Sequence, residues 1–257
     1  MSLPAFRIVL ITGANSGVGY ATSKVLATAT TTPSFHVIMT GRSFEKVQKA
    51  KAELEQEISA TATGTLTALQ LDVTDAKSVE DVAKYVKENH GHLDALINNA
   101  ANGSRDSDLV TRLRLCFDTN VIGAALVAQT FRPLLLKSSN PYSIWVSSGA
   151  GSIKLSSEPG RDPANLDNDE AYRASKAALN MVMQCEHRDW HKKGLKTLAL
   201  SPGFVVSNLR GTSEEMRNPG GKAGDPIVAG QTILGVLEGK RDDDAGKLVH
   251  KRGVYPW

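Results

Sequence analysis

Short apolar segments alternate with longer amphipathic segments along this chain. The apolar runs predict strands at residues 6–12, 36–40, 66–73, 93–97, 143–147, 196–200 and 247–250. Between them, apolar residues recur three or four positions apart, which predicts helices from about residue 17, at 44–60, after 75, and at 109–136, 171–192 and 225–238. We expect the long helix at 109–136 to bend near Pro133.

Strand–helix alternation of this kind predicts an α/β fold with one doubly wound parallel sheet of about seven strands and helices on both faces. The chain has no proline- or glycine-rich linker and no internal repeat, so we predict a single domain over residues 1–257. In such a sheet, ligands bind beyond the carboxyl ends of the strands. The loops that follow the predicted strands are therefore where we expect the chemistry.

Composition narrows the class of protein. Of 257 residues, 41% are hydrophobic and 22% are charged, which is enough to bury a core and excludes general disorder. No window approaches about 18 uninterrupted apolar residues, and neither end carries a targeting signal, so we expect a cytoplasmic protein with no membrane partner. The two cysteines exclude a disulfide framework. The net charge of +3 is well mixed along the chain, which predicts no nucleic-acid partner.

A glycine-rich loop, TGANSGVG at residues 12–19, follows the first predicted strand. Glycines permit a tight turn and let backbone amides approach a pyrophosphate at a helix N-terminus. The spacing is GxxxGxG rather than the usual GxGxxG, and a plain turn is the alternative interpretation. The candidate cofactor-binding residues in this loop are Gly13, Asn15, Ser16, Gly17, Val18 and Gly19.

The loop after the second strand discriminates between the two nicotinamide dinucleotides. Residues 40–43, TGRS, offer no carboxylate for a ribose 2′-hydroxyl, whereas Arg42 is a bidentate donor suited to a 2′-phosphate. This favours NADP over NAD, against the alternative of a solvated surface arginine. Further candidate cofactor contacts at later strand ends are Asp72, Val73, Asn98, Asn99 and Ala100, of which Asp72 could equally be a turn residue.

Two segments place a lysine four residues after a tyrosine on one helix face: Tyr172 with Lys176, and Tyr20 with Lys24. A nearby ammonium lowers the pKa of a phenol and makes it usable as an acid or base near neutrality. At least one pair is incidental. Tyr20 lies on the helix that packs against the sheet, so we predict a packing role for it, whereas Tyr172 follows the fifth strand at the ligand edge.

Other chemistries find little support. Ser147 or Ser148, at the end of the fifth strand, could hydrogen-bond a substrate carbonyl, although a polar loop start explains either serine alone. There is no Gly-x-Ser-x-Gly elbow and no zinc-ligand spacing. His187 and His191 lie four apart on a predicted helix without a third ligand in phase, so we predict no metal site.

Taken in order, TGxxxGxG, LDVTD, NNA, Asn120, Ser148, YxxxK and SPGFVVS closely resemble the classical short-chain dehydrogenase/reductase family over residues 6–207. The resemblance implies a Rossmann-type fold and an NAD(P)-dependent hydride transfer without a metal. Gly41 stands where NAD-using members carry an acid. With Arg42 beside it, this resembles the NADP-preferring, carbonyl-reductase-like members.

The resemblance also implies residue roles. Tyr172 is the general acid/base, Lys176 lowers its pKa and binds the nicotinamide ribose, and Ser148 polarises the substrate carbonyl. Asn120 holds a water that links Lys176 to solvent. The nicotinamide end of the cofactor contacts Pro202, Gly203, Val205 and Ser207.

The resulting hypothesis is an NADPH-dependent oxidoreductase (EC 1.1.1.-) that reversibly reduces an aldehyde or ketone to an alcohol. A non-catalytic NADP-binding sensor or scaffold is the alternative, and it is disfavoured because the whole Asn120, Ser148, Tyr172 and Lys176 set is present. We expect a substrate lid at about residues 204–225 and a looped insertion at about residues 155–168, before the tyrosine.

The predicted helices that carry Asn120 and Tyr172 are apolar on more than one face. A helix that only covers a sheet needs one apolar stripe, so a second copy of the chain would cover the other face. We therefore expect a homodimer or homotetramer. In carbonyl-reductase-like relatives a longer insertion covers this surface instead. Here the insertion is short and polar.

Overall fold

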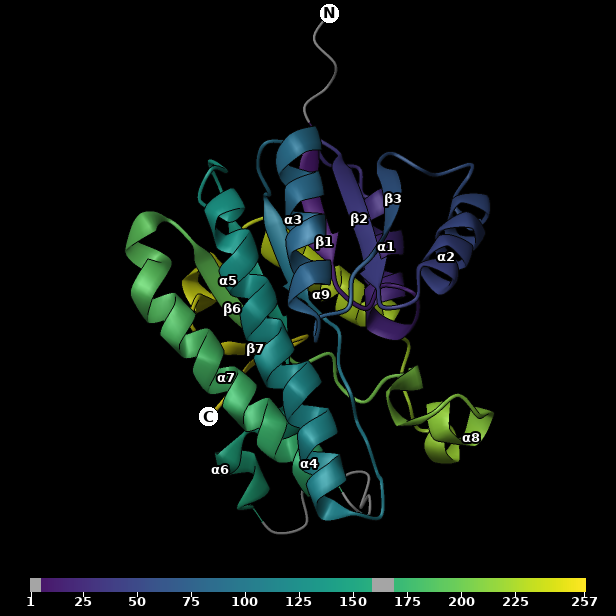
Figure 1. Ribbon diagram of the computed structural model, residues 1–257, viewed down its shortest axis with the longest axis vertical. Helices are drawn as coiled ribbons and strands as arrows, with labels where there is room; N and C mark the ends of the chain where they lie inside the picture. The colour runs from purple at the N-terminus through teal and green to yellow at the C-terminus, as the bar shows by residue number, and fades with distance from the viewer. Residues whose placement is uncertain (1–5, 159–168) are drawn as a thin grey trace, which may run out of the picture.

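One eight-stranded sheet forms the centre of the structure, a computed structural model that describes residues 6–158 and 169–257 (Figure 1). Its strands lie in the order β3-β2-β1-β4-β5-β6-β7-β8. They are β1 (Arg7–Ile11), β2 (Phe35–Gly41), β3 (Thr65–Gln70), β4 (Ala95–Asn98), β5 (Tyr142–Val146), β6 (Lys196–Leu200), β7 (Leu248–His250) and β8 (Gly253–Tyr255). The order reverses between β1 and β4, which is the switch point where such sheets bind ligands.

Helices cover both faces of the sheet (Figure 1). The longer ones are α1 (Gly17–Ala27), α2 (Phe44–Glu57), α3 (Ala76–Asn89), α4 (Leu109–Phe117), α5 (Ala124–Leu135), α7 (Glu170–Trp190) and α9 (Ile227–Leu237). Two single-turn helices, α6 (Ile153–Ser156) and α8 (Glu214–Arg217), lie in the loops beyond the carboxyl ends of β5 and β6. The expected single-domain, Rossmann-type α/β fold is confirmed.

The central strands β1, β2, β4, β5 and β6 are buried on both faces, which explains why their sequences are mostly continuous apolar runs. Val9 and Ile11 of β1 pack with α1, α2 and α9 in one cluster of buried side chains. Ile8 and Leu10 point the other way and pack with α3, α5 and α7 in a second cluster. This alternation follows from the two-residue period of a strand. The sheet is thereby held rigidly between two layers of helices.

The eighth strand was not predicted from the sequence. β8 pairs antiparallel with β7, with Leu248 opposite Tyr255, whereas the other strand pairs are all parallel. It is only three residues long, and Val254 at its centre is 40% exposed. An edge strand of this kind gives no apolar run for a pattern to detect.

The long helix expected at 109–136 is divided, but not where the sequence suggested. Asp118–Gly123 forms a π-helical segment between α4 and α5, while Pro133 lies inside α5 without ending it. A Cβ at Gly123 would lie 2.8 Å from the carbonyl oxygen of Val73, so the chain passes closely here. π-Helical turns are frequent at functional sites, because the widened turn redirects side chains. Here the turn carries Asn120.

Within the described residues, no helix is long and apolar enough to cross a membrane.

Candidate active site

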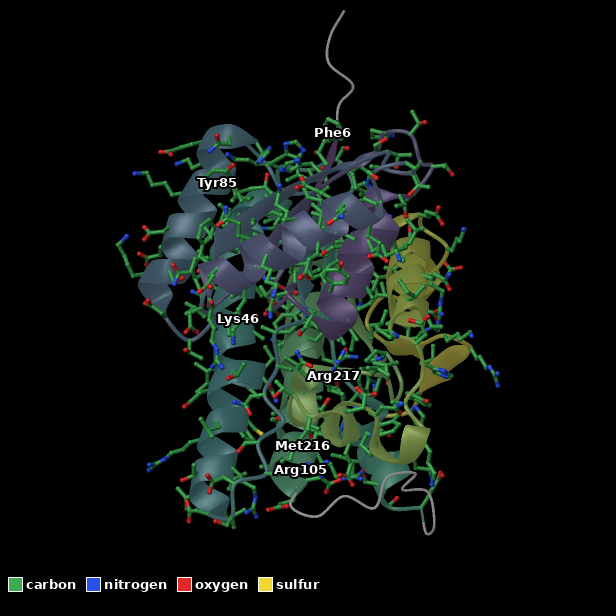
Figure 2. The ribbon with its side chains drawn as sticks, turned by 90° about the vertical axis from the view of Figure 1, so that its right-hand side faces the viewer. Phe6, Lys46, Tyr85, Arg105, Met216 and Arg217 are labelled. Carbon is green, nitrogen blue, oxygen red and sulfur yellow. The ribbon has the colours of Figure 1, made fainter. Side chains whose placement is uncertain are left out.

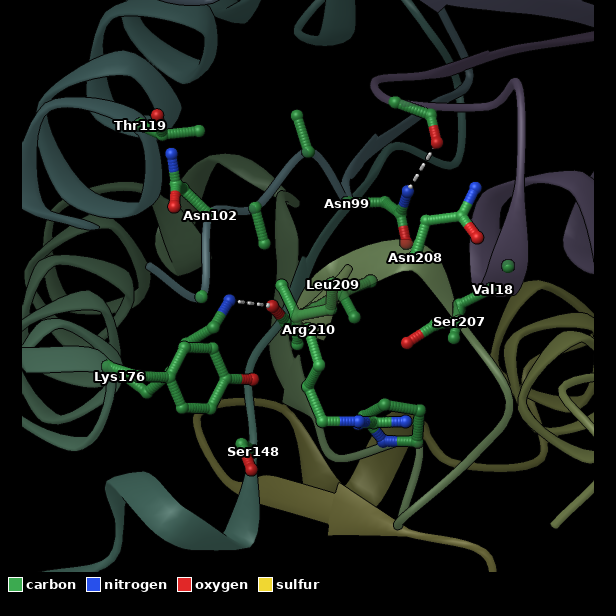
Figure 3. Close-up of a pocket in the computed structure, with 18 of the residues that line it drawn as sticks. Val18, Asn99, Asn102, Thr119, Ser148, Lys176, Ser207, Asn208, Leu209 and Arg210 are labelled. Carbon is green, nitrogen blue, oxygen red and sulfur yellow. Dashed lines mark hydrogen bonds between the residues drawn. The ribbon is translucent and has the colours of Figure 1, made fainter. Parts of the chain in front are cut away.

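A cavity of ≈ 930 Å³ opens beyond the carboxyl ends of the parallel strands. It is lined by the loops that follow β1 to β6, and Figure 3 shows residues from these loops converging on it. The cavity has two ends of different chemistry. One is formed by the glycine-rich loop and the start of α2, and the other by Ser148 and α7.

The glycine-rich loop forms a cradle of backbone at the start of α1. Gly13 and Gly17 have φ values of 65° and 56°, in the left-handed region that favours glycine. A Cβ at Gly19 would lie 2.6 Å from the carbonyl oxygen of Gly13. The N-cap Ser16 makes no side-chain hydrogen bond, so the first amides of α1 are left for a ligand. The predicted residues of this loop that line the cavity are Gly13, Asn15, Ser16, Gly17 and Val18.

Thr12 and Asn99 tie this cradle to the end of β4. The Thr12 hydroxyl accepts hydrogen bonds from the amides of Asn99 and Ala100, each at 2.9 Å. The Asn99 side chain donates to the carbonyls of Thr12 (2.8 Å) and Gly13 (3.0 Å). Asn99 and Ala100 also line the cavity. Asn98 does not: it is 4% exposed, and its side chain has no hydrogen-bond partner among the described residues.

Two cations, not one, face the cavity at the end of β2. Arg42, the predicted donor to a 2′-phosphate, is exposed and lines the cavity, and Lys46 on the first turn of α2 lines it as well. The Ser43 hydroxyl caps α2 by accepting a hydrogen bond from the amide of Lys46. The sequence analysis did not identify Lys46, because a lysine within a charged helical segment cannot be distinguished by pattern from a solvent-exposed lysine without a function.

Asp72 and Val73 line the same end of the cavity. The Asp72 carboxylate accepts hydrogen bonds from the amide (2.9 Å) and the hydroxyl (2.7 Å) of Thr74. This is the turn geometry that the sequence left open as the alternative for Asp72.

Tyr172 and Lys176 lie one turn apart on α7, at the other end of the cavity. Lys176 is 2% exposed, and its Nζ donates a 2.8 Å hydrogen bond to the carbonyl of Val146, the last residue of β5. Its Nζ lies 5.7 Å from the centre of the Tyr172 ring. Ser148, two residues beyond β5, lines the cavity beside them (Figure 3). The three residues that the sequence grouped at a carbonyl site are therefore together.

The pKa values of Tyr172 and Lys176 are both shifted by burial, and the shift of Tyr172 is opposite to the predicted one. Burial raises the pKa of Tyr172 to about 12, although a hydrogen bond with Ser148 and the charge of Arg210 act in the opposite direction. Burial also lowers the pKa of Lys176 to about 8. The predicted lowering of the phenol pKa is thus wrong for the protein alone, because desolvation outweighs the nearby charges. Near neutrality Tyr172 is a protonated phenol and therefore a proton donor.

The Asn120 side chain forms hydrogen bonds with the loop after β4 and with α7, next to the site. Its side-chain oxygen accepts from the amide of Asn102 at 2.7 Å, and its nitrogen donates to the Asn102 carbonyl and the Ser175 hydroxyl, each at 2.9 Å. No hydrogen bond within the described chain joins Asn120 to Lys176. Asn120 therefore fastens the loop after β4 to the helix that carries Tyr172.

The segment after β6 closes the third side of the cavity. All four of the residues expected at the nicotinamide end line it: Pro202, Gly203, Val205 and Ser207. The expected lid at 204–225 contains α8 and two short 3-10 turns, Asn208–Arg210 and Pro219–Gly221. Cavity-lining residues that the sequence reasoning missed include Arg105, Leu209, Arg210 and Tyr255. They belong to loops and an edge strand with no recognisable motif. Most of the expected insertion at 155–168 lies outside the described residues.

The second tyrosine–lysine pair lies away from the cavity. The Tyr20 hydroxyl and the Lys24 ammonium both bind Glu57 of α2, at 3.2 and 2.5 Å. Tyr20 packs against the buried cluster of α1, α2 and α9, which confirms the predicted packing role. In the described part of the chain, no group of His, Cys, Asp or Glu side chains could hold a metal ion.

Comparisons with known proteins agree with this geometry. The model of the family described as short chain dehydrogenase matches residues 7–218. The short-chain dehydrogenase/reductase tropE of Talaromyces stipitatus is 37% identical, and the match covers 100% of both chains. The short-chain dehydrogenase anuI of Penicillium roqueforti is 34% identical, over 94% of this chain and 93% of that protein.

A solved structure is similar as well. An NADPH-bound carbonyl reductase from chicken fatty liver superposes with a TM-score of 0.81 at 28% identity, over 98% of this chain and 99% of that one. The chain belongs to the short-chain dehydrogenase/reductase family, and it is an oxidoreductase of that family.

The buried ammonium can be tested without any assumption about the reaction. We expect Lys176 to lose its proton near pH 8, well below the usual range for lysine, because burial destabilises its charged form. NMR titration of lysine side-chain carbons, with the Lys176 signal assigned by its loss in Lys176→Arg, measures this. Exposed Lys154 serves as the internal control. A Lys176 midpoint at or above that of Lys154 would contradict the electrostatics described above.

Proposed function

We propose that this protein is an NADPH-dependent carbonyl reductase that converts an aldehyde or ketone to an alcohol, reversibly. The proposal rests on one observation: two groups of residues with different chemistry line opposite ends of a single cavity. Arg42 and Lys46 lie beside the backbone cradle at one end, and Ser148, Tyr172 and Lys176 lie at the other. The similarity to the chicken protein, an NADPH-bound carbonyl reductase, supports the same assignment.

The cavity fits a dinucleotide. A Cβ at Gly13 would lie 2.9 Å from the Cα of Ala100, so glycine is needed here for the cradle to pack against the segment that follows β4. The uncapped start of α1 suits a pyrophosphate. Arg42 and Lys46 suit a 2′-phosphate, because both are cations and no carboxylate lies at 40–43. When bound, NADPH would supply the hydride.

The residues at the other end would manage the substrate oxygen. The protonated phenol of Tyr172 donates its proton to that oxygen as the carbonyl is reduced, and the Ser148 hydroxyl donates a hydrogen bond to the same atom. The ammonium of Lys176 stabilises the phenolate that remains, since an opposite charge close by favours the ionised form. In the reverse direction the phenolate takes the proton of the alcohol. The retention of all these groups disfavours a non-catalytic sensor.

Oxidation of NADPH with a panel of aldehydes and ketones, followed by absorbance, tests the activity. We expect Tyr172→Phe to lower kcat by about 10²–10⁴-fold, the usual contribution of a positioned proton donor, with little change in NADPH affinity. Tyr20→Phe is the matched control, because Tyr20 has the same lysine spacing but lies outside the cavity. Equal losses in the two variants, or no turnover by the wild type with any carbonyl, would refute the proposal.

Cofactor preference depends on the two cations at the end of β2. We expect Arg42→Leu to raise the KM for NADPH about 10- to 100-fold, the worth of a charge-assisted hydrogen bond, and to leave the KM for NADH unchanged. Lys46→Leu should act in the same direction with a smaller effect. Lys49→Leu, an exposed change on the same helix, is the control. A wild type that binds NADH as tightly as NADPH would show that Arg42 has been misassigned.

A homodimer or homotetramer remains our proposal for the assembly. Two large apolar side chains on the outer faces of the π-helical turn and α7, Ile122 and Met181, are 60% and 65% exposed in a single chain. Val110 and Leu115 of α4 are exposed as well. These residues would be covered by the same helices of a second copy in a two-fold contact.

Sedimentation at micromolar concentration measures the assembly. We expect a species of at least twice 27.5 kDa for the wild type, and Ile122→Glu with Met181→Glu should convert it to a monomer. Val254→Glu, which places a charge at another exposed apolar position, should leave the assembly intact. A wild type that sediments only as a monomer would exclude the oligomer.

A further inference from the structure

Two arginines stand at the phenol end of the cavity without a carboxylate partner. Arg105, in the loop after β4, and Arg210, in the lid segment, both line the cavity. Neither forms an ion pair with a carboxylate in the described parts of the chain, although Asp118, Glu158 and Asp169 line the same cavity. Asp169 instead pairs with Arg173 at 2.6 Å. Among the described residues, no carboxylate therefore neutralises these two positive charges.

The guanidinium of Arg210 is fixed in place. It lies over the Phe204 ring, with 4.6 Å between its central carbon and the ring centre. Its Nε donates to the Met216 carbonyl at 3.0 Å, and its Nη2 donates to the carbonyls of Val205 (3.0 Å) and Arg217 (2.9 Å). Nη1 has no hydrogen-bond partner among the described residues. A planar donor held this way on three sides is preorganised for an acceptor on the fourth.

Arg105 and Tyr172 lie within electrostatic reach of this guanidinium. Burial lowers the pKa of Arg210, and the charge of Arg105 acts in the same direction, whereas Tyr172 acts in the opposite direction. In Figure 2 Arg105 lies at the lower end of the molecule, well away from Lys46. In Figure 3 the Arg210 side chain lies between Ser148 and Ser207. Two like charges close together are unfavourable until an anion lies between them.

We propose that Arg210, assisted by Arg105, binds an anionic group of the substrate, so that the preferred substrates are carbonyl compounds that carry a carboxylate. This inference rests on the proposed carbonyl reductase function. The phosphates of the dinucleotide are the other source of such an anion. The lid residue Ser207 lies against Gly17 of the cradle, whereas Arg210 lines the same cavity as Tyr172 and its charge acts on that phenol, which favours the substrate as the source.

The test compares 4-carboxybenzaldehyde with its uncharged methyl ester, methyl 4-formylbenzoate, in the NADPH oxidation assay. We expect the wild type to prefer the acid. Arg210→Met, which keeps a long side chain over Phe204, should lower kcat/KM for the acid about tenfold more than it lowers kcat/KM for the ester, so that the preference for the acid is lost. Arg105→Met should also lower kcat/KM for the acid. Arg114→Met, an exposed change on α4 outside the cavity, is the matched control.

Arg105→Met also covers the case in which Arg210→Met fails to fold, because Arg105 is exposed and makes no hydrogen bond with the described chain. Equal rates for acid and ester in the wild type would overturn the inference. So would an Arg210→Met or Arg105→Met variant that keeps the preference, or one whose main change is a higher KM for NADPH.

Failure of the proposed function would look different, since neither aldehyde would then consume NADPH. In that case thermal shift with sodium benzoate decides the matter. Stabilisation of the wild type, but not of Arg210→Met or Arg105→Met, supports the anion site. No stabilisation of the wild type overturns it.

Discussion

The hydrogen bond from the buried Lys176 ammonium to the Val146 carbonyl is the contact on which the candidate site depends. A buried charge is tolerated only where it is hydrogen-bonded, so this bond at 2.8 Å fixes α7 against the carboxyl end of β5. Tyr172 lies one turn before Lys176, and Ser148 lies two residues after Val146. A single contact between a helix and a strand therefore places all three polar groups at one end of the cavity.

The opposite end of the cavity, at the glycine-rich loop, is held by hydrogen bonds between uncharged groups. Thr12 and Asn99 join the glycine-rich loop to β4 through four hydrogen bonds of 2.8 to 3.0 Å. Because the glycine-rich loop follows β1 and Ser148 follows β5, with β4 between these two parallel strands, the sheet sets the distance between the two ends. The third wall is different: the lid is built from short turns, and the guanidinium of Arg210 gathers three of its carbonyls. The two ends are therefore positioned by the sheet, whereas the third wall is held by hydrogen bonds within its own segment.

The sequence predicts most of the fold, because strands buried on both faces are continuous apolar runs and helices are amphipathic. The π-helical turn at Asp118–Gly123 escaped prediction because it depends on tertiary contacts of Asn120 with Asn102 and Ser175. β8 escaped because an exposed three-residue edge has no pattern.

In the site, Tyr172, Lys176 and Ser148 were predictable from a spacing and an order of motifs. The raised pKa of Tyr172 was not, since it depends on how completely the fold removes water from the phenol. Arg210 could not be predicted either, because its place in the cavity depends on how the segment after β6 folds. Asn98 was predicted to contact the cofactor and instead lies buried outside the cavity.

The central claim is that the two ends of this cavity bring NADPH and a carbonyl into direct reaction. Transfer of the label from NADPH deuterated at the reactive nicotinamide carbon, followed by mass spectrometry of the alcohol, tests it most directly. The account predicts one deuterium on the carbinol carbon of the product when the correct face of the nicotinamide is labelled, and none when the other face is labelled. An alcohol without deuterium from either labelled cofactor, or the absence of any alcohol, would contradict it.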